Sequence, residues 1–104
     1  NNNLAYANVV ASIDALDLAE KLGMDRQVAI EVIKLSSGAS TGFGIIADPQ
    51  MFQKISGASS NLAKDVHHLS IVAEERGLGG APLLSLSRTA ESKIAELAAR
   101  IAGK

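Results

Sequence analysis

Apolar residues recur at helical spacing in four long stretches of the chain. In residues 4–22 the repeat is carried by Val9, Ile13 and Leu16, with small alanines between them, while the acidic residues fall mostly off that stripe. Residues 26–36, 60–76 and 82–102 show similar spacing, and no segment alternates apolar and polar residues as a half-buried strand does. The pattern predicts an all-α fold.

Capping residues mark the boundary between the first two of these stretches. Gly23 is placed to end the first helix, because glycine readily adopts the conformation that follows a helix end. Asp25 can cap the second, since its carboxylate can accept backbone N–H bonds at a helix start. Residues 26–36 are apolar on more than one side, so we expect this second helix to be buried.

The middle of the chain is less regular. Asp48-Pro49 is a typical cap and first-turn pair, which predicts a short helix over residues 49–55 that Gly57 would close. Ser59 or Ser60 is then expected to start the long helix over residues 60–76. The stretch before Asp48 is expected to be irregular.

The last helix is expected to begin at Pro82, in the first-turn position that proline favours, after Arg76-Gly77 has ended the preceding one. Its apolar positions recur every three or four residues: Leu83, Leu86, Ala90, Ile94, Leu97 and Ile101. We therefore predict that residues 1–104 form one domain, a multi-helix bundle of about four long helices and one short helix.

Composition excludes several classes of function. Apolar residues make up 47% of the chain but aromatics only 3%, so the core is expected to use Ala, Leu, Ile and Val. A net charge of −1 gives no electrostatic footprint for nucleic acid or anionic lipid. The chain has no cysteine and no apolar run approaching the roughly 20 residues of a membrane span. We expect neither nucleic acid nor a membrane as partner, and a cytoplasmic location.

The common catalytic and metal-binding patterns are absent. His67 and His68 are adjacent, so on a helix they point about 100° apart and would not share a metal. Gly42-Phe43-Gly44 has no preceding strand and no third spaced glycine, which excludes a dinucleotide fingerprint. We expect no metal site.

Several short motifs nevertheless follow one another in a characteristic order. They are Asn1-Asn2 at the head of a long helix, Asp14 within it, Gly23-Met24-Asp25, Ser36-Ser37-Gly38, Lys64-Asp65-Val66 and Pro82. Over essentially the whole chain, this order resembles the helical C-terminal domain of the β-hydroxyacid dehydrogenases, the family that includes 3-hydroxyisobutyrate dehydrogenase.

The resemblance implies a function and a set of site residues. The chain would be the second domain of a two-domain dehydrogenase that oxidises a small β-hydroxyacid, with NAD or NADP bound mainly by an N-terminal Rossmann domain. Asn2 would be catalytic and would fix the substrate, beside a catalytic lysine expected three residues upstream of Asn1. Asp65 would contact the substrate and Lys64 the cofactor. The family typically assembles through this domain, so a homodimer or larger is expected, and the domain alone is expected to be inactive.

Two departures leave the substrate open. The stretch between Ser40 and Lys64 looks shorter than is usual in the family. Where family members often carry an aromatic residue near the substrate, this chain has Gly57 and Ala58, and the nearest aromatic is Phe52. The identity of the hydroxyacid is therefore not fixed by this sequence. The choice between NAD and NADP would be made by a residue of the Rossmann domain.

Other readings stay open at this point. One alternative is a 6-phosphogluconate dehydrogenase-type second domain, which would be expected to carry clustered cations to bind a phosphate. The four arginines of this chain are instead scattered along the sequence: Arg26, Arg76, Arg88 and Arg100. A helical interaction module without enzyme activity is the other alternative. In that case Asn2 would be a helix cap, Lys64 a solvated lysine and Asp65 an acid favoured by the helix dipole.

Overall fold

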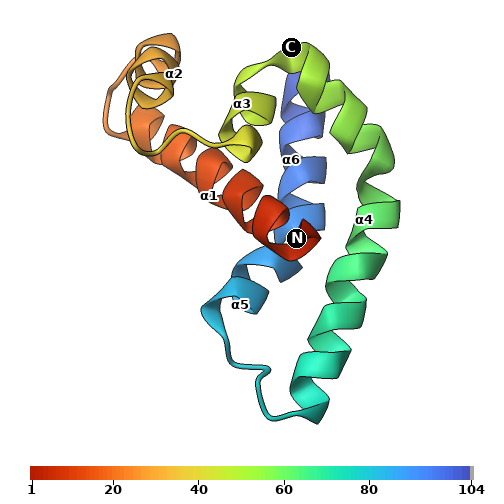
Figure 1. Cartoon of the computed structure of the whole chain (residues 1–104). Coiled ribbons are helices and arrows are strands. Elements are labelled where there is room, and N and C mark those ends of the chain that lie inside the picture. The colour runs from red at the N-terminus through yellow and green to blue at the C-terminus, as the bar shows by residue number, and fades with distance from the viewer. Residues whose placement is uncertain (104) are drawn as a thin grey trace.

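The computed structural model describes the backbone of residues 1–103, and the side chains of residues 1–54 and 64–103. Within this part of the chain every regular element is a helix, which confirms the predicted all-α class (Figure 1). The helices are α1 (Asn2–Lys21), α2 (Arg26–Lys34), α3 (Thr41–Ala47), α4 (Pro49–Glu75), α5 (Pro82–Arg88) and α6 (Ala90–Ala102).

Helix α1 forms the centre of the fold. Its predicted stripe of Val9, Ile13 and Leu16 is buried, and the neighbouring Val10 is buried as well. It packs most extensively against α3 and α5, and it also contacts α2, α4 and α6. One helix therefore supplies the surface on which all the others assemble.

Helices α4 and α6 run side by side in opposite directions, and α1 crosses them (Figure 1). Val66 of α4 is buried with Ile94 and Leu97 of α6 in the same apolar cluster as the α1 stripe. Because a helix rises 1.5 Å per residue, the 27 residues of α4 span about 40 Å. This is close to the longest dimension of the molecule, 44 Å.

The predicted caps are present. The Asp25 carboxylate accepts a hydrogen bond from the backbone N–H of Val28 at 3.1 Å, and Asp48 accepts one from Gln50 at 2.9 Å. Gly23 follows α1 with a φ of 91°, and Gly77 follows α4 with a φ of 74°. Both values lie in the left-handed region where glycine is favoured, so these two glycines do end their helices.

The predicted division of residues 49–76 is wrong. The short helix over 49–55 and the long helix over 60–76 are one continuous helix, α4, which passes through Gly57 and starts at Pro49 rather than at Ser59 or Ser60. A glycine inside a helix costs only about 1 kcal/mol relative to alanine, which packing along a long helix can offset. Leu62 belongs to the predicted apolar pattern of residues 60–76, but its side chain lies outside those that the structure describes.

The stretch expected to be irregular contains a short helix, α3. Ser40 caps it by accepting a hydrogen bond from the N–H of Phe43 at 2.9 Å. Phe43 and Ile46, three residues apart, face the core and are buried. A Cβ added to Gly42 would lie 2.9 Å from the Asn8 Cβ and 3.1 Å from the Val9 backbone nitrogen, so glycine is what lets α3 lie directly against α1.

The predicted last helix is divided in two. Residues 82–102 break at Thr89 into α5 and α6. The Thr89 hydroxyl donates to the Leu86 carbonyl oxygen at 2.8 Å, and the Thr89 N–H bonds to the same oxygen at 3.2 Å. Both bonds close the last turn of α5 and redirect the chain into α6.

Helix α2 is largely exposed, contrary to the prediction that it would be buried. Ala29 and Ile30 pack inward, but Val28, Val32 and Leu35 are 54%, 56% and 89% exposed. In Figure 1, α2 lies at the far end of α1, away from α4 and α6. Because α1 is its principal neighbour, only one side of α2 is covered. The exposed apolar side defines a stripe of Val28, Val32 and Leu35, which we call the α2 stripe.

Candidate functional site

The structure brings together two residues that the sequence marked separately. The Asn2 side chain donates a hydrogen bond from Nδ2 to Asp65 Oδ2 at 2.9 Å, across 63 residues of sequence. Asn2 is the first residue of α1, and Asp65 lies in the second half of α4. The contact follows from the crossing of the two helices, which places the start of α1 beside α4 (Figure 1).

A groove of about 360 Å³ opens beside Asn2. We call it the neutral groove, because its lining side chains are apolar, amide, hydroxyl or phenol groups. They belong to Asn1, Asn2, Leu4, Ala5, Tyr6, Asn8, Val9, Thr41, Gly42 and Ile45. A surface of this kind can hold a small aliphatic group and can orient a hydroxyl through Asn2, Asn8 or Thr41.

Tyr6 forms one wall of the neutral groove and is 5% exposed. Burial raises the pKa of its phenol above the ordinary value, and the negative charges of Glu91 and Asp65 raise it further. The phenol therefore keeps its proton throughout the neutral range. Asp65 therefore lies close enough to bond to Asn2 and to influence the pKa of Tyr6.

Lys64 lies one residue before Asp65 on α4 and is exposed. It forms no hydrogen bond or ion pair with the residues that the structure describes, and it is not among the residues lining the neutral groove. Adjacent residues on a helix leave the axis about 100° apart, so Lys64 and Asp65 address different directions.

A second groove, of about 560 Å³, lies on the other side of Tyr6, and we call it the polar groove. Arg88 crosses it, donating from Nε to Ser70 Oγ at 3.1 Å and from a terminal nitrogen to Glu74 at 2.8 Å. Ser70 is buried and donates its own hydrogen bond to the Val66 carbonyl oxygen at 3.1 Å. These bonds link α5 to α4, which indicates a structural role for Arg88.

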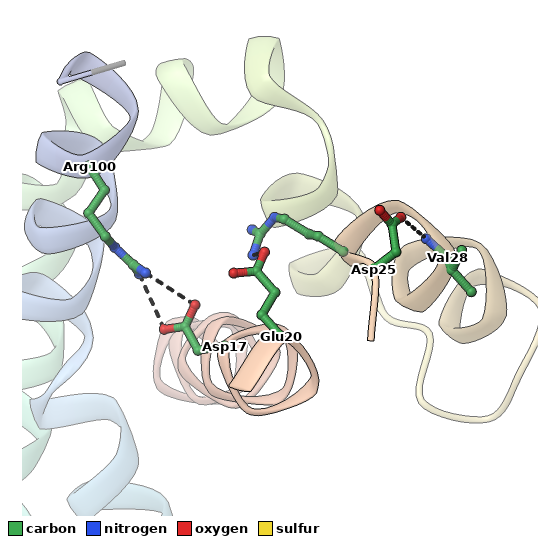
Figure 2. Close-up of polar contacts among 6 residues, drawn as sticks. Asp17, Glu20, Asp25, Val28 and Arg100 are labelled. Carbon is green, nitrogen blue, oxygen red and sulfur yellow. Dashed lines mark hydrogen bonds and ion pairs between the residues drawn. The ribbon is translucent and has the colours of Figure 1, made fainter. Parts of the chain in front are cut away.

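The far end of α1 carries two more charge pairs. Arg100 of α6 donates to both carboxylate oxygens of Asp17, at 3.3 and 3.2 Å, as Figure 2 shows. These hydrogen bonds raise the pKa of the guanidinium. One turn further along α1, Glu20 accepts from Arg26 at 3.3 Å. The pairs hold α6 and α2 to α1, and they neutralise both arginines.

The remaining candidates contribute less. His67 lines the polar groove, and both His67 and His68 are exposed. Among the described residues, no three His, Asp or Glu side chains come close enough to hold a metal ion. Asn3 is buried, and within the described part of the chain its Oδ1 has no hydrogen-bond partner. No helix in that part has the length and apolarity needed to cross a membrane.

Sequence reasoning missed the walls of the neutral groove. Tyr6 stands four residues after Asn2, a spacing that puts the two on one helix face, and this was the available signal. Thr41 and Gly42 could have been found by extending the Ser40 cap into a helix. Phe52, the aromatic nearest in sequence to the Lys-Asp pair, is buried in the core and does not line this groove.

Comparison with known proteins adds no relative. No protein-family model matches the chain, and neither a curated protein nor a solved structure does.

Proposed function

We propose that this chain is the C-terminal helical domain of an NAD(P)-dependent oxidoreductase that acts on a small β-hydroxyacid. The observation that carries the proposal is the hydrogen bond between Asn2 and Asp65. In the family that the sequence resembles, the motifs holding these two residues belong to one active site. A chance resemblance gives no reason for residues 63 positions apart to meet at 2.9 Å.

The neutral groove suits the substrate side of such a site. It offers an aliphatic surface for the carbon skeleton, and Asn2 can hold the reacting hydroxyl. Its lining side chains carry no cation for the carboxylate of a hydroxyacid. The carboxylate would then be held by groups outside this chain, as expected if another domain completes the site.

Lys64 is the residue of this chain best suited to the cofactor. Its exposed ammonium has no partner within the described residues, and it lies next to the Asn2–Asp65 contact. A lysine is a mobile point charge that can contact phosphate or ribose oxygens. The nicotinamide, when bound, supplies the hydride chemistry, and this domain supplies orientation and charge.

The structure offers an argument against the phosphosugar alternative. Arg26, Arg88 and Arg100 are each paired with a carboxylate of the same chain. Guanidinium groups neutralised in this way attract a phosphate less strongly than free ones. A small β-hydroxyacid without a phosphate therefore remains the preferred substrate class.

A helical interaction module is the second candidate, and the α2 stripe favours it. The same stripe also fits the predicted assembly of this domain into a homodimer, because an apolar row of this kind is usually covered by a partner. The two functions differ in one respect, since only the enzyme requires the neutral groove and Asn2 to meet a second domain.

The deciding experiment examines the natural polypeptide that carries this domain. We expect its reading frame to encode a dinucleotide-binding fingerprint before Asn1 and a lysine three residues upstream of Asn1. The purified polypeptide should reduce NAD or NADP when supplied with 3-hydroxyisobutyrate or a related small β-hydroxyacid. If neither the fingerprint nor cofactor reduction with a panel of such acids is found, the enzyme proposal is wrong.

A further inference from the structure

The partner of Asn2 determines which way its amide faces. A carboxylate only accepts hydrogen bonds, whereas an amide has a nitrogen that donates and an oxygen that accepts. The Asp65 carboxylate can therefore bind the Asn2 nitrogen but not the Asn2 oxygen, in agreement with the Nδ2–Oδ2 contact of 2.9 Å. The orientation of the amide follows from this chemistry, whereas amides without such a partner can be assigned either way.

This orientation controls what Asn2 can offer elsewhere. The oxygen and nitrogen of an amide diverge from one carbon, so fixing Nδ2 against Asp65 turns Oδ1 away from Asp65. Asn2 lines the neutral groove, whereas Asp65 does not. Asp65 thus acts on the groove through Asn2 and not by lining it.

We propose that Asp65 is a positioning residue that holds the Asn2 amide in one orientation, so that Oδ1 is kept as an acceptor for the hydroxyl group of the substrate. This inference rests on the proposed function, and it gives Asp65 a role different from direct substrate contact. An alcohol donates a hydrogen bond, and the carbonyl group of its oxidised product cannot. A fixed acceptor at Asn2 therefore favours the hydroxyacid over its oxidised product.

Substitutions at position 65 separate positioning from simple attachment of α4 to α1. Asp65→Asn keeps the size and can still bond to Asn2, but its own amide can donate as well as accept. The Asn2 amide can then turn over and present its nitrogen. Asp65→Glu keeps an acceptor that cannot donate, on a longer side chain, and Asp65→Ala removes the bond.

The first measurement uses NMR on the 104-residue chain. In the wild type we expect a scalar coupling across the hydrogen bond, between Asn2 Nδ2 and the Asp65 carboxyl carbon. We also expect one of the two Nδ2 protons to exchange slowly with solvent. Asp65→Asn should show two orientations of the Asn2 amide, or their average. Absence of the coupling in the wild type, or a single unchanged orientation in Asp65→Asn, would overturn the proposal.

The second measurement uses the activity of the natural polypeptide. We expect Asp65→Asn to lower kcat about threefold to tenfold with unchanged stability, Asp65→Glu to retain more activity, and Asp65→Ala to retain least. Glu75→Gln is the control, because it removes one negative charge from an exposed position of α4 that has no bonded partner among the described residues. A wild-type kcat in Asp65→Asn would show that the Asn2–Asp65 bond only attaches α4 to α1, and would overturn the positioning role of Asp65. A polypeptide that keeps the NMR coupling but oxidises no hydroxyacid would refute the proposed function and leave the orientation of Asn2 standing.

Discussion

Arg100 binds both carboxylate oxygens of Asp17 and thereby joins two helices separated by 83 residues of sequence. The two hydrogen bonds, at 3.3 and 3.2 Å, hold the end of α6 against the last turns of α1. Paired bonds from one guanidinium restrict the geometry more than a single contact does. The pair is partly exposed, so its contribution to stability is expected to be modest.

Arg100→Ala should lower the free energy of unfolding by about 0.5–1 kcal/mol, the upper part of the range for exposed ion pairs. The loss should shrink at high salt, because screening weakens the wild-type pair. Urea denaturation at low and high NaCl concentration measures both effects. Arg76→Ala is the control, since Arg76 has no bonded side-chain partner in the described part of the chain. Equal losses in the two variants would contradict the prediction.

Tyr6 should titrate above the ordinary tyrosine pKa of about 10. The folded chain holds the phenol proton more tightly than the unfolded chain. The resulting stabilisation is complete below the unfolded pKa and is lost as pH rises through the folded value. The chain has one tyrosine and no tryptophan, so tyrosinate absorbance reports on Tyr6 alone.

The comparison for this titration is the same chain unfolded in urea. Glu91→Gln should lower the folded pKa in part, because Glu91 is the second cause of the shift after burial. Identical titration curves for the folded and unfolded chains would show that Tyr6 is not buried as described.

Gly42→Ala should destabilise the fold by about 1–3 kcal/mol, the usual cost of inserting atoms into a close-packed contact. The added Cβ would meet the Val9 backbone nitrogen at 3.1 Å, and backbone cannot move aside as a flexible side chain can. Gly44→Ala is the matched control in the same helix, because a Cβ there meets nothing within 4 Å. It should leave stability unchanged or raise it by up to about 1 kcal/mol. Thermal unfolding of both variants tests the contrast.

The α2 stripe should mediate self-association. We expect the wild type to sediment as a dimer or larger at concentrations well above micromolar, and Val32→Lys to shift it toward monomer by placing a charge in the stripe. Gln27→Lys adds the same charge to α2 outside the stripe and should leave association unchanged. A monomeric wild type, or equal effects of the two lysines, would refute this role of the stripe.

In the natural polypeptide, Asn2→Ala should lower kcat/KM more than tenfold, which corresponds to about 1.4 kcal/mol of transition-state stabilisation. Lys64→Ala should act mainly on the KM for cofactor or substrate. Both variants should remain folded, since neither side chain belongs to the core cluster. Lys54→Ala serves as control for a lysine on the same helix. Unchanged kcat/KM in Asn2→Ala would remove Asn2 from the site.

Local signals in the sequence predicted the ends of helices well. Asp25, Asp48 and Gly23 act through bonds and torsions of neighbouring residues, so their effect is visible in a short window. Gly57 was misread because its weak local preference is outweighed by contacts that α4 makes with distant helices. The break at Thr89 depends likewise on how α5 and α6 each meet the rest of the fold.

The site was predictable only in part, for a related reason. Asn2 and Asp65 were chosen from motif order, but their hydrogen bond depends on the angle at which α1 crosses α4. The groove needs α3, and α3 was hidden in a stretch containing two glycines, Gly42 and Gly44. The exposure of Val32 was equally unpredictable, because periodicity shows that a side is apolar and not whether a neighbour covers it.

The central position of α1 has a consequence for folding of this domain during synthesis. Within this domain α1 is synthesised before α6, yet Val10 and Ile13 of α1 share a core with Ile94 and Leu97 of α6. A nascent chain lacking α6 leaves that apolar face uncovered, and closing so long a loop is slow. We therefore expect this domain to complete its folding only after α6 has been synthesised, and a form truncated before α6 to be more open to proteolysis.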